Sequence, residues 1–106
     1  MSFKSREDSH ETHYAHDEDV KFRVRARRDK LFGRWVAEQL GNTGDEAERY
    51  ARELVHIDLE HPGDDEMLGK VRTDLANAGT GISDALIERR LEEYTGRARE
   101  QIMNQG

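Results

Sequence analysis

The chain has 106 residues, a length that suits one domain with a modest helical core. Charged residues make up 38% of it and the formal net charge is −6, which argues against a general affinity for nucleic acid. It has no cysteine, which excludes disulfides, thiolate metal sites and a thiol nucleophile, and which suits the cytoplasm. No segment is apolar enough for a signal peptide or a membrane span, so we expect no direct membrane insertion.

Residues 1–16 are polar and acidic, and their only apolar side chains are Met1, Phe3, Tyr14 and Ala15. Because burial of so little apolar area cannot offset the loss of conformational entropy on ordering, we expect a mobile tail when the protein is alone. No proline or glycine interrupts the segment, and Phe3 and Tyr14 fall within about 20° of one helical stripe. The segment therefore looks able to fold as a helix against a groove supplied by a partner.

The rest of the chain, residues 17–106, shows helical periodicity and almost no strand signals. Breaks at Gly41, Pro62-Gly63 and Gly79-Thr80-Gly81 divide it into four helices. We place these helices at about 17–40, 44–60, 64–78 and 83–103. Short connections favour antiparallel neighbours, so the predicted fold is all-α, a four-helix bundle with a mobile N-terminal tail.

Apolar residues of the first helix repeat at helical spacing as Val20, Val24, Leu31 and Trp35, flanked by Phe22, Phe32 and Val36. Thr43 with Glu46 predicts a capping box for the second helix, and Ser83 is a good N-cap for the fourth. Gly33 and Gly69 lie inside predicted helices, where close helix approach would explain them.

Residues 20–40 carry seven basic and two acidic side chains, whereas residues 1–19 carry six acids and two bases. The densest basic cluster comprises Arg23, Arg25, Arg27, Arg28 and Lys30. It suits a phosphate or nucleotide contact, docking to an acidic partner, or neutralisation by acids of the other helices and the tail. Nucleic acid is disfavoured because no aromatic side chains interleave to stack bases.

Three histidines, His10, His13 and His16, repeat in the tail at three-residue spacing. They suit a metal site, a pH sensor or plain solvated side chains, and a metal site is disfavoured because the tail offers no fixed scaffold. His56 and His61 are expected on the surface. No Gly-rich phosphate loop, metalloprotease helix or nucleophile elbow occurs, so we predict no enzyme activity, no catalytic residues and no metal.

The block from Ala26 to Ala37 reads Ala-Arg-Arg-Asp-Lys-Leu-Phe-Gly-Arg-Trp-Val-Ala. It resembles the pattern Ala-Arg-Arg-Asn-Lys-Leu-Leu-Gly-x-Trp-Ala-Ala of the zeta subunit, the ATPase inhibitor of alphaproteobacterial F-type ATP synthases. The likeness continues on both sides, for example at Arg6-Glu7 and Pro62-Gly63-Asp64. Asp29 departs from it, since an amide is common at that position.

This resemblance implies a regulatory subunit that blocks ATP hydrolysis when its N-terminal segment becomes helical in an α/β catalytic interface of the enzyme head. Its partners would be the α and β subunits, with the central stalk as a further contact. We expect a monomer when free, in the cytoplasm at the inner-membrane ATP synthase. The implied inhibitory residues are Phe3, Arg6, Glu7, Glu11, Tyr14 and Asp17.

The resemblance also implies ADP or ATP as a ligand of the bundle, with no cofactor required. On this basis we predict Arg27, Arg28 and Lys30 as the nucleotide-binding residues. The alternative function is a nucleotide-sensing helical protein whose tail is incidental.

Overall fold

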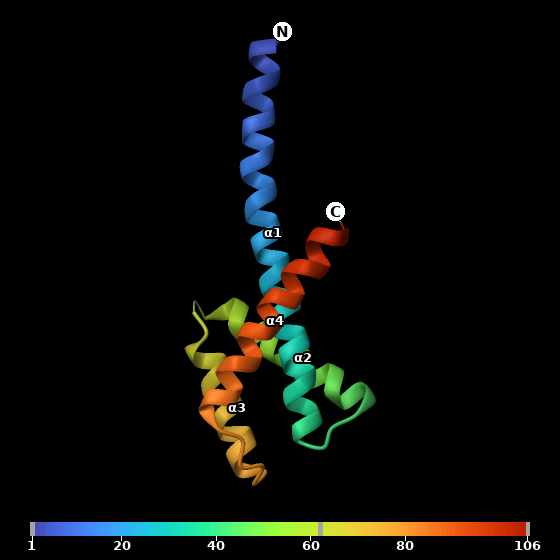
Figure 1. The fold of residues 1–106 in the computed structure, drawn as a ribbon, viewed down its shortest axis with the longest axis vertical. Coiled ribbons are helices and arrows are strands. Elements are labelled where there is room, and N and C mark those ends of the chain that lie inside the picture. Colours follow the sequence, from blue (N-terminus) through green and yellow to red (C-terminus); the bar gives the residue numbers. More distant parts are fainter. Residues whose placement is uncertain (1, 62, 106) are drawn as a thin grey trace.

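The computed structural model describes residues 2–61 and 63–105, and side chains for 17–61 and 63–104. Its four helices are α1 (Ser2–Gln39), α2 (Gly44–Glu60), α3 (Asp65–Asn77) and α4 (Asp84–Gln105) (Figure 1). No strand occurs in the described residues, so the predicted all-α, four-helix fold is confirmed. The three later helices begin and end within two residues of the predicted ranges.

The first helix is much longer than predicted, because it begins at Ser2 and not near Asp17. No proline lies in α1 and its first glycine is Gly33, so nothing in the sequence interrupts its hydrogen bonding. The N-terminal part of α1 runs away from the other three helices (Figure 1), and the molecule is 64 Å along its longest axis. The mobility of residues 1–16 in the free protein stays a prediction.

The core lies where α1 packs against α2 and α4, with α3 closing it from the side of α2. In α1 the inward residues are Phe32, Trp35 and Val36, whereas Leu31 is half-buried and Phe22 is exposed. The rings of Phe32 and Trp35 stack with their centroids 6.1 Å apart, so the predicted core role of Trp35 is confirmed. The other helices contribute Leu54, Met67, Val71, Leu75, Ile87 and Leu91.

Two of the predicted helix ends are confirmed and a third lacks one interaction. Gly41 follows α1 with φ of 87°, the left-handed conformation in which a glycine costs least. Ser83 Oγ accepts a hydrogen bond from the amide of Leu86 at 3.1 Å and so caps α4. Thr43 occupies the N-cap of α2 but makes no side-chain capping bond, so the predicted capping box does not form. Among the described residues, no helix combines the length and apolarity needed to cross a membrane.

The crossing of α1 and α2 is unusually close at Gly33. A Cβ atom added there would lie 2.7 Å from the Cα of Ala51 and 3.1 Å from its Cβ, so the two backbones meet over this glycine. The expectation of close helix approach is therefore confirmed at Gly33. It is wrong at Gly69, where a Cβ would meet nothing within 4 Å.

We expect Gly33→Ala and Gly69→Ala to have opposite effects on the free energy of unfolding. Gly33→Ala should destabilise the fold by about 1–3 kcal/mol, because the backbones of α1 and α2 must separate. Gly69→Ala should stabilise it by about 0.5–1 kcal/mol, because alanine loses less conformational entropy in a helix. Urea unfolding followed by circular dichroism measures both, and stabilisation by Gly33→Ala would contradict the close crossing.

Candidate functional site

The predicted inhibitory residues lie in the projecting part of α1. The backbone of Phe3, Arg6, Glu7, Glu11 and Tyr14 is helical, but their side chains lie outside those that the structure describes, as do the side chains of the three tail histidines. Asp17 is exposed on the same helix. The structure thus places this segment on a continuous helix that leaves the bundle (Figure 1).

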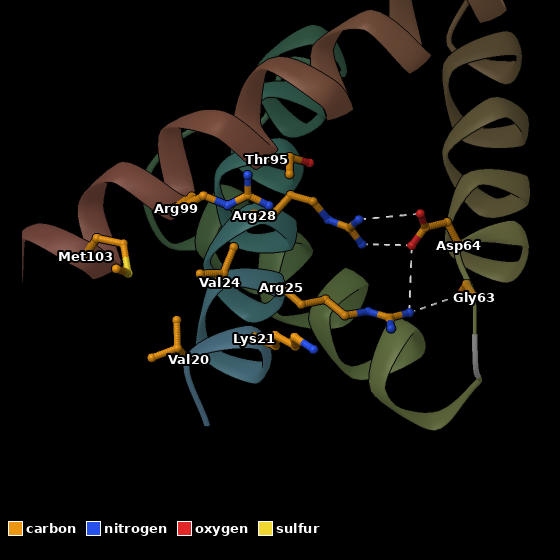
Figure 2. A pocket seen from close by; sticks show the side chains of 10 residues that line it. All are labelled: Val20, Lys21, Val24, Arg25, Arg28, Gly63, Asp64, Thr95, Arg99 and Met103. Carbon is orange, nitrogen blue, oxygen red and sulfur yellow. Dashed lines mark hydrogen bonds and ion pairs between the residues drawn. The ribbon is translucent and has the colours of Figure 1, made fainter. Parts of the chain in front are cut away.

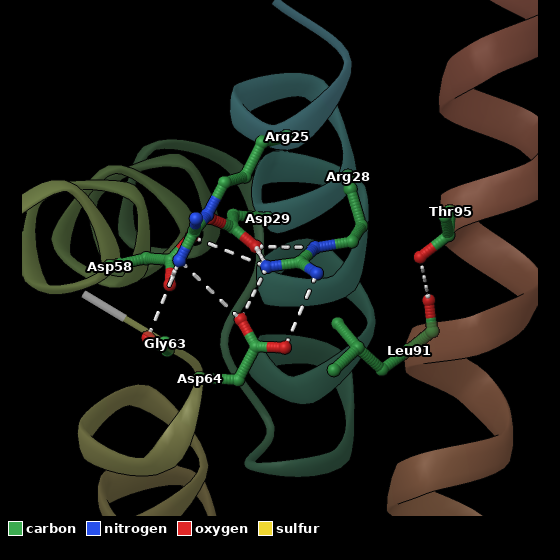
Figure 3. A network of polar contacts seen from close by, with 8 residues as sticks. All are labelled: Arg25, Arg28, Asp29, Asp58, Gly63, Asp64, Leu91 and Thr95. Atoms are coloured by element: carbon green, nitrogen blue, oxygen red, sulfur yellow. Dashed lines mark hydrogen bonds and ion pairs between the residues drawn. The ribbon is translucent and has the colours of Figure 1, made fainter. Parts of the chain in front are cut away.

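A partly buried ionic cluster holds the base of that projecting helix and comprises Arg25, Arg28, Asp29, Asp58 and Asp64 (Figure 3). Arg25 of α1 donates two hydrogen bonds to Asp58 of α2, at 2.6 and 2.8 Å. Arg28 donates to Asp58 at 3.2 Å, to Asp64 at 2.8 Å and to Asp29 at 2.9 Å. Because Asp64 immediately precedes α3, the cluster joins α1 to both α2 and α3.

The pKa values of two carboxyl groups in this cluster are shifted in opposite directions. Burial, together with hydrogen bonding to Asp58, raises the pKa of Asp29 to about 8 although Arg28 opposes the change. Burial also acts to raise the pKa of Asp58, but hydrogen bonds from Arg25 and Asp29 outweigh it and lower that pKa to about 2. Asp29 Oδ2 is buried and has no hydrogen-bond partner. Because the raised pKa lets Asp29 keep its proton where an ordinary carboxyl has lost it, the side chain stays uncharged among its ionised neighbours, as an amide would.

Beside the cluster lies a cavity of about 390 Å³ between α1 and the C-terminal part of α4, which we call the α1–α4 cavity (Figure 2). Val20, Val24 and Met103 give it an apolar lining. Its cationic side chains are Lys21, Arg25, Arg28 and Arg99, of which Arg25 and Arg28 already bind Asp58 and Asp64. It is the size of a small-molecule site, with cations at one side of an apolar wall.

A second hollow of about 530 Å³ lies where α1, α2 and the end of α4 meet, and we call it the basic groove. Arg23, Arg27 and Lys30 of α1 and Arg52 of α2 line it together with apolar side chains. The predicted basic cluster is therefore divided. Arg25 and Arg28 are neutralised by acids of α2 and of the turn before α3, while the other three cations line the groove.

The three residues predicted to bind nucleotide do not converge on one hollow. Arg28 lines the α1–α4 cavity, whereas Arg27 and Lys30 line the basic groove. Sequence reasoning missed Arg99 and Arg52, the cations that α4 and α2 bring to these two sites. The sequence shows on which face of its own helix each of these two arginines lies. It does not show which other helix that face lies against.

Among the described residues, no three or more histidine, aspartate or glutamate side chains lie together as metal ligands would. His56 is exposed and pairs with Glu60, one helical turn on, at 2.8 Å. His61 is exposed too, so both histidines lie on the surface as predicted.

Comparison with known proteins identifies a family and a similar fold among solved structures. The sequence profile of the family described as ATPase inhibitor subunit zeta matches residues 1–101. A protein titled "Solution NMR structure of the protein" is 38% identical, with a TM-score of 0.72, over 82% of this chain and 99% of its own. No curated protein sequence matches the chain.

We expect the stability of the protein to fall as pH rises from about 5 to 8. In this range the unfolded chain has lost the proton of Asp29, whose ordinary pKa is 3.8, while the folded chain keeps it. The folded state then binds more protons, and the free energy of unfolding falls by up to about 1.4 kcal/mol per pH unit. The contribution of Asp58 is constant there and is lost only as pH drops below its ordinary value of 3.8 toward about 2.

The variant Asp29→Asn removes this titration and keeps an uncharged side chain of the same size. Urea unfolding at several pH values should show a flatter profile than the wild type and higher stability at pH 8. Asp19→Asn, an exposed aspartate on the same helix that faces Arg23 at 3.7 Å, is the matched control and should leave the slope unchanged. A slope that Asp29→Asn does not alter would contradict the retained proton.

Proposed function

This chain belongs to the ATPase inhibitor subunit zeta family, and on that premise we propose that it blocks ATP hydrolysis by placing its N-terminal segment in an α/β catalytic interface of the F-type ATP synthase. Family membership makes the ATP synthase its partner and inhibition its role. One observation carries the mechanism, namely that α1 continues unbroken from the bundle core to Ser2 and stands clear of the other helices (Figure 1).

A projecting helix suits insertion into a groove between two subunits. Residues 2–16 span about 22 Å at the rise of an α-helix, long enough to reach into an interface while the bundle stays outside. Phe3 and Tyr14, on one stripe, would supply aromatic anchors. Arg6, Glu7, Glu11 and Asp17 would supply polar contacts around them.

The ionic cluster at the base of the helix would let the bundle resist motion of the enzyme. Arg25 and Arg28 connect α1 to α2 and to the start of α3, so a force on the inserted segment is carried into the whole bundle. Inhibition of this kind requires no chemistry by the chain itself, which acts as a non-catalytic subunit. Its site of action would be the catalytic head on the cytoplasmic side, with the α and β subunits and the central stalk as contacts.

The α1–α4 cavity favours ADP or ATP binding as a second function of the bundle. An adenine ring would suit the apolar wall of Val20, Val24 and Met103, and phosphate groups would suit Lys21 and Arg99 at its edge. Of the three residues predicted from the sequence, only Arg28 lines this cavity.

We expect deletion of residues 1–16 to abolish inhibition of the purified catalytic head and to leave a folded bundle, because the core residues all follow residue 31. Phe3→Ala with Tyr14→Ala should weaken inhibition by at least about tenfold, since buried aromatic anchors contribute about 2 kcal/mol or more. Ser9→Ala is the control within the same segment. Steady-state ATPase activity measures all four proteins, and equal inhibition by the truncated chain would overturn the proposal.

The nucleotide proposal is tested separately by calorimetric titration of the free protein with ADP. Lys21→Ala with Arg99→Ala should weaken binding by about tenfold or more, because two cations near the phosphates are lost. Arg89→Ala, an exposed arginine on the outer part of α4, should bind as the wild type does. Equal affinity in both variants would place the nucleotide elsewhere or exclude it.

A further inference from the structure

The basic groove exposes apolar side chains that the fold leaves uncovered. Phe22 is 55% exposed and Leu59 is 46% exposed, and both line this groove. Of the three large apolar side chains that are exposed among the described residues, only Met103 lies outside it. Val55 and Ile102 extend the apolar floor between them. Apolar side chains gathered in a groove with a polar rim indicate a binding surface.

The rim of this groove is basic although the chain as a whole is acidic. Its four cations are Arg23, Arg27, Lys30 and Arg52, and no acidic side chain is among the described residues that line it. Arg27 donates to the neutral amide of Gln101 at 2.8 Å, and Arg23 faces the exposed Asp19 at 3.7 Å. Lys30 and Arg52 form no ion pair within 4 Å among the described side chains, although both are close enough to Glu48 to help lower the pKa of that carboxyl, which Arg34 binds. The groove therefore carries positive charge that the bundle only partly balances.

We propose that the basic groove binds an acidic amphipathic helix on the catalytic head of the ATP synthase, as a second contact separate from the N-terminal segment. This inference rests on the proposed function, because it takes the same enzyme as the partner. Apolar side chains of the bound helix would cover Phe22 and Leu59, and its acids would pair with Lys30 and Arg52.

The walls of the groove suit a helix better than an irregular peptide. Phe22, Ala26 and Lys30 are spaced by four residues along α1, and Arg52, Val55 and Leu59 occupy one face of α2. Two helices side by side form a channel into which a third helix packs its own ridge. The charge of the rim then selects a helix with an acidic face.

The chain's own acidic segment is poorly placed to fill the groove. Residues 2–16 belong to α1 itself, which runs away from the bundle without a proline or glycine that would let it turn back (Figure 1). A second copy would bring its own net negative charge close to the first. The catalytic head is therefore the partner to which the proposal commits.

Two contacts on one rigid chain would slow release from the enzyme. Once the N-terminal segment is inserted, α1 holds the groove at a fixed position, so its binding becomes an intramolecular event. The groove should then affect dissociation more than association.

The test measures binding of the full-length protein to the purified catalytic head, at low and high salt, by surface-based kinetics. The variant is Lys30→Glu with Arg52→Glu, and the matched control is Arg49→Glu with Arg89→Glu, which changes the net charge equally at exposed positions on α2 and α4. We expect about tenfold weaker binding for the groove variant, mostly through faster dissociation, and a weaker dependence on salt. The control should bind nearly as the wild type does, and circular dichroism should show equal helix content in all three.

A photoreactive amino acid in place of Leu59 identifies the occupant. Cross-links to an acidic helical segment of the head support the proposal. Cross-links to the chain's own N-terminal segment, to a second copy or to no part of the head overturn it, as does equal binding of the groove variant and the wild type. A wild-type protein that neither binds nor inhibits the head would overturn the proposed function as well. If the wild type inhibits the head and the groove variant binds it equally well, this inference alone is overturned.

Discussion

The structure depends on one interaction, the pairing of two arginines on α1 with carboxylates from α2 and from the turn before α3. Arg28, Asp29 and Asp58 are buried or nearly so, where a charge loses hydration and needs a partner, while Arg25 and Asp64 complete the cluster at its partly exposed edge. An ionised Asp29 would give the cluster three negative charges against two positive ones, and burial raises its pKa to about 8, which keeps it protonated near neutral pH. The cluster joins α1 to α2 and to the turn before α3 at the point where α1 leaves the bundle.

The same basic stretch of α1 has two roles because its side chains point to different neighbours. Cations at positions 25 and 28 meet acids inside the fold, while those at 23, 27 and 30 line the open groove beside α2. The basic stretch of α1 therefore forms ion pairs inside the fold on one face and leaves cations available to a partner on another. This division explains how an acidic protein can still offer a cationic surface to a partner.

Helical periodicity and loop signals were enough to predict four helices and part of the core, since Phe32, Trp35 and Val36 of the predicted first-helix stripe are buried. The start of α1 could not be predicted, because a polar helix beyond the bundle has no apolar stripe to mark it. The burial of Asp29 and the exposure of Phe22 were also missed. Both depend on which helix lies opposite, and spacing within one helix carries no information about that.

When the N-terminal segment is inserted as a helix, its continuity with the ionic cluster would make α1 a lever. From Arg25 to Ser2 the helix extends about 35 Å, so a tilt of about 10° at the cluster would displace its end by about 6 Å, slightly more than one helical turn. Small changes in packing near the pivot are therefore amplified at the far end. The direction in which the N-terminal segment points would then depend on side chains that never touch the enzyme. Selection on those side chains would change how well the segment fits its interface.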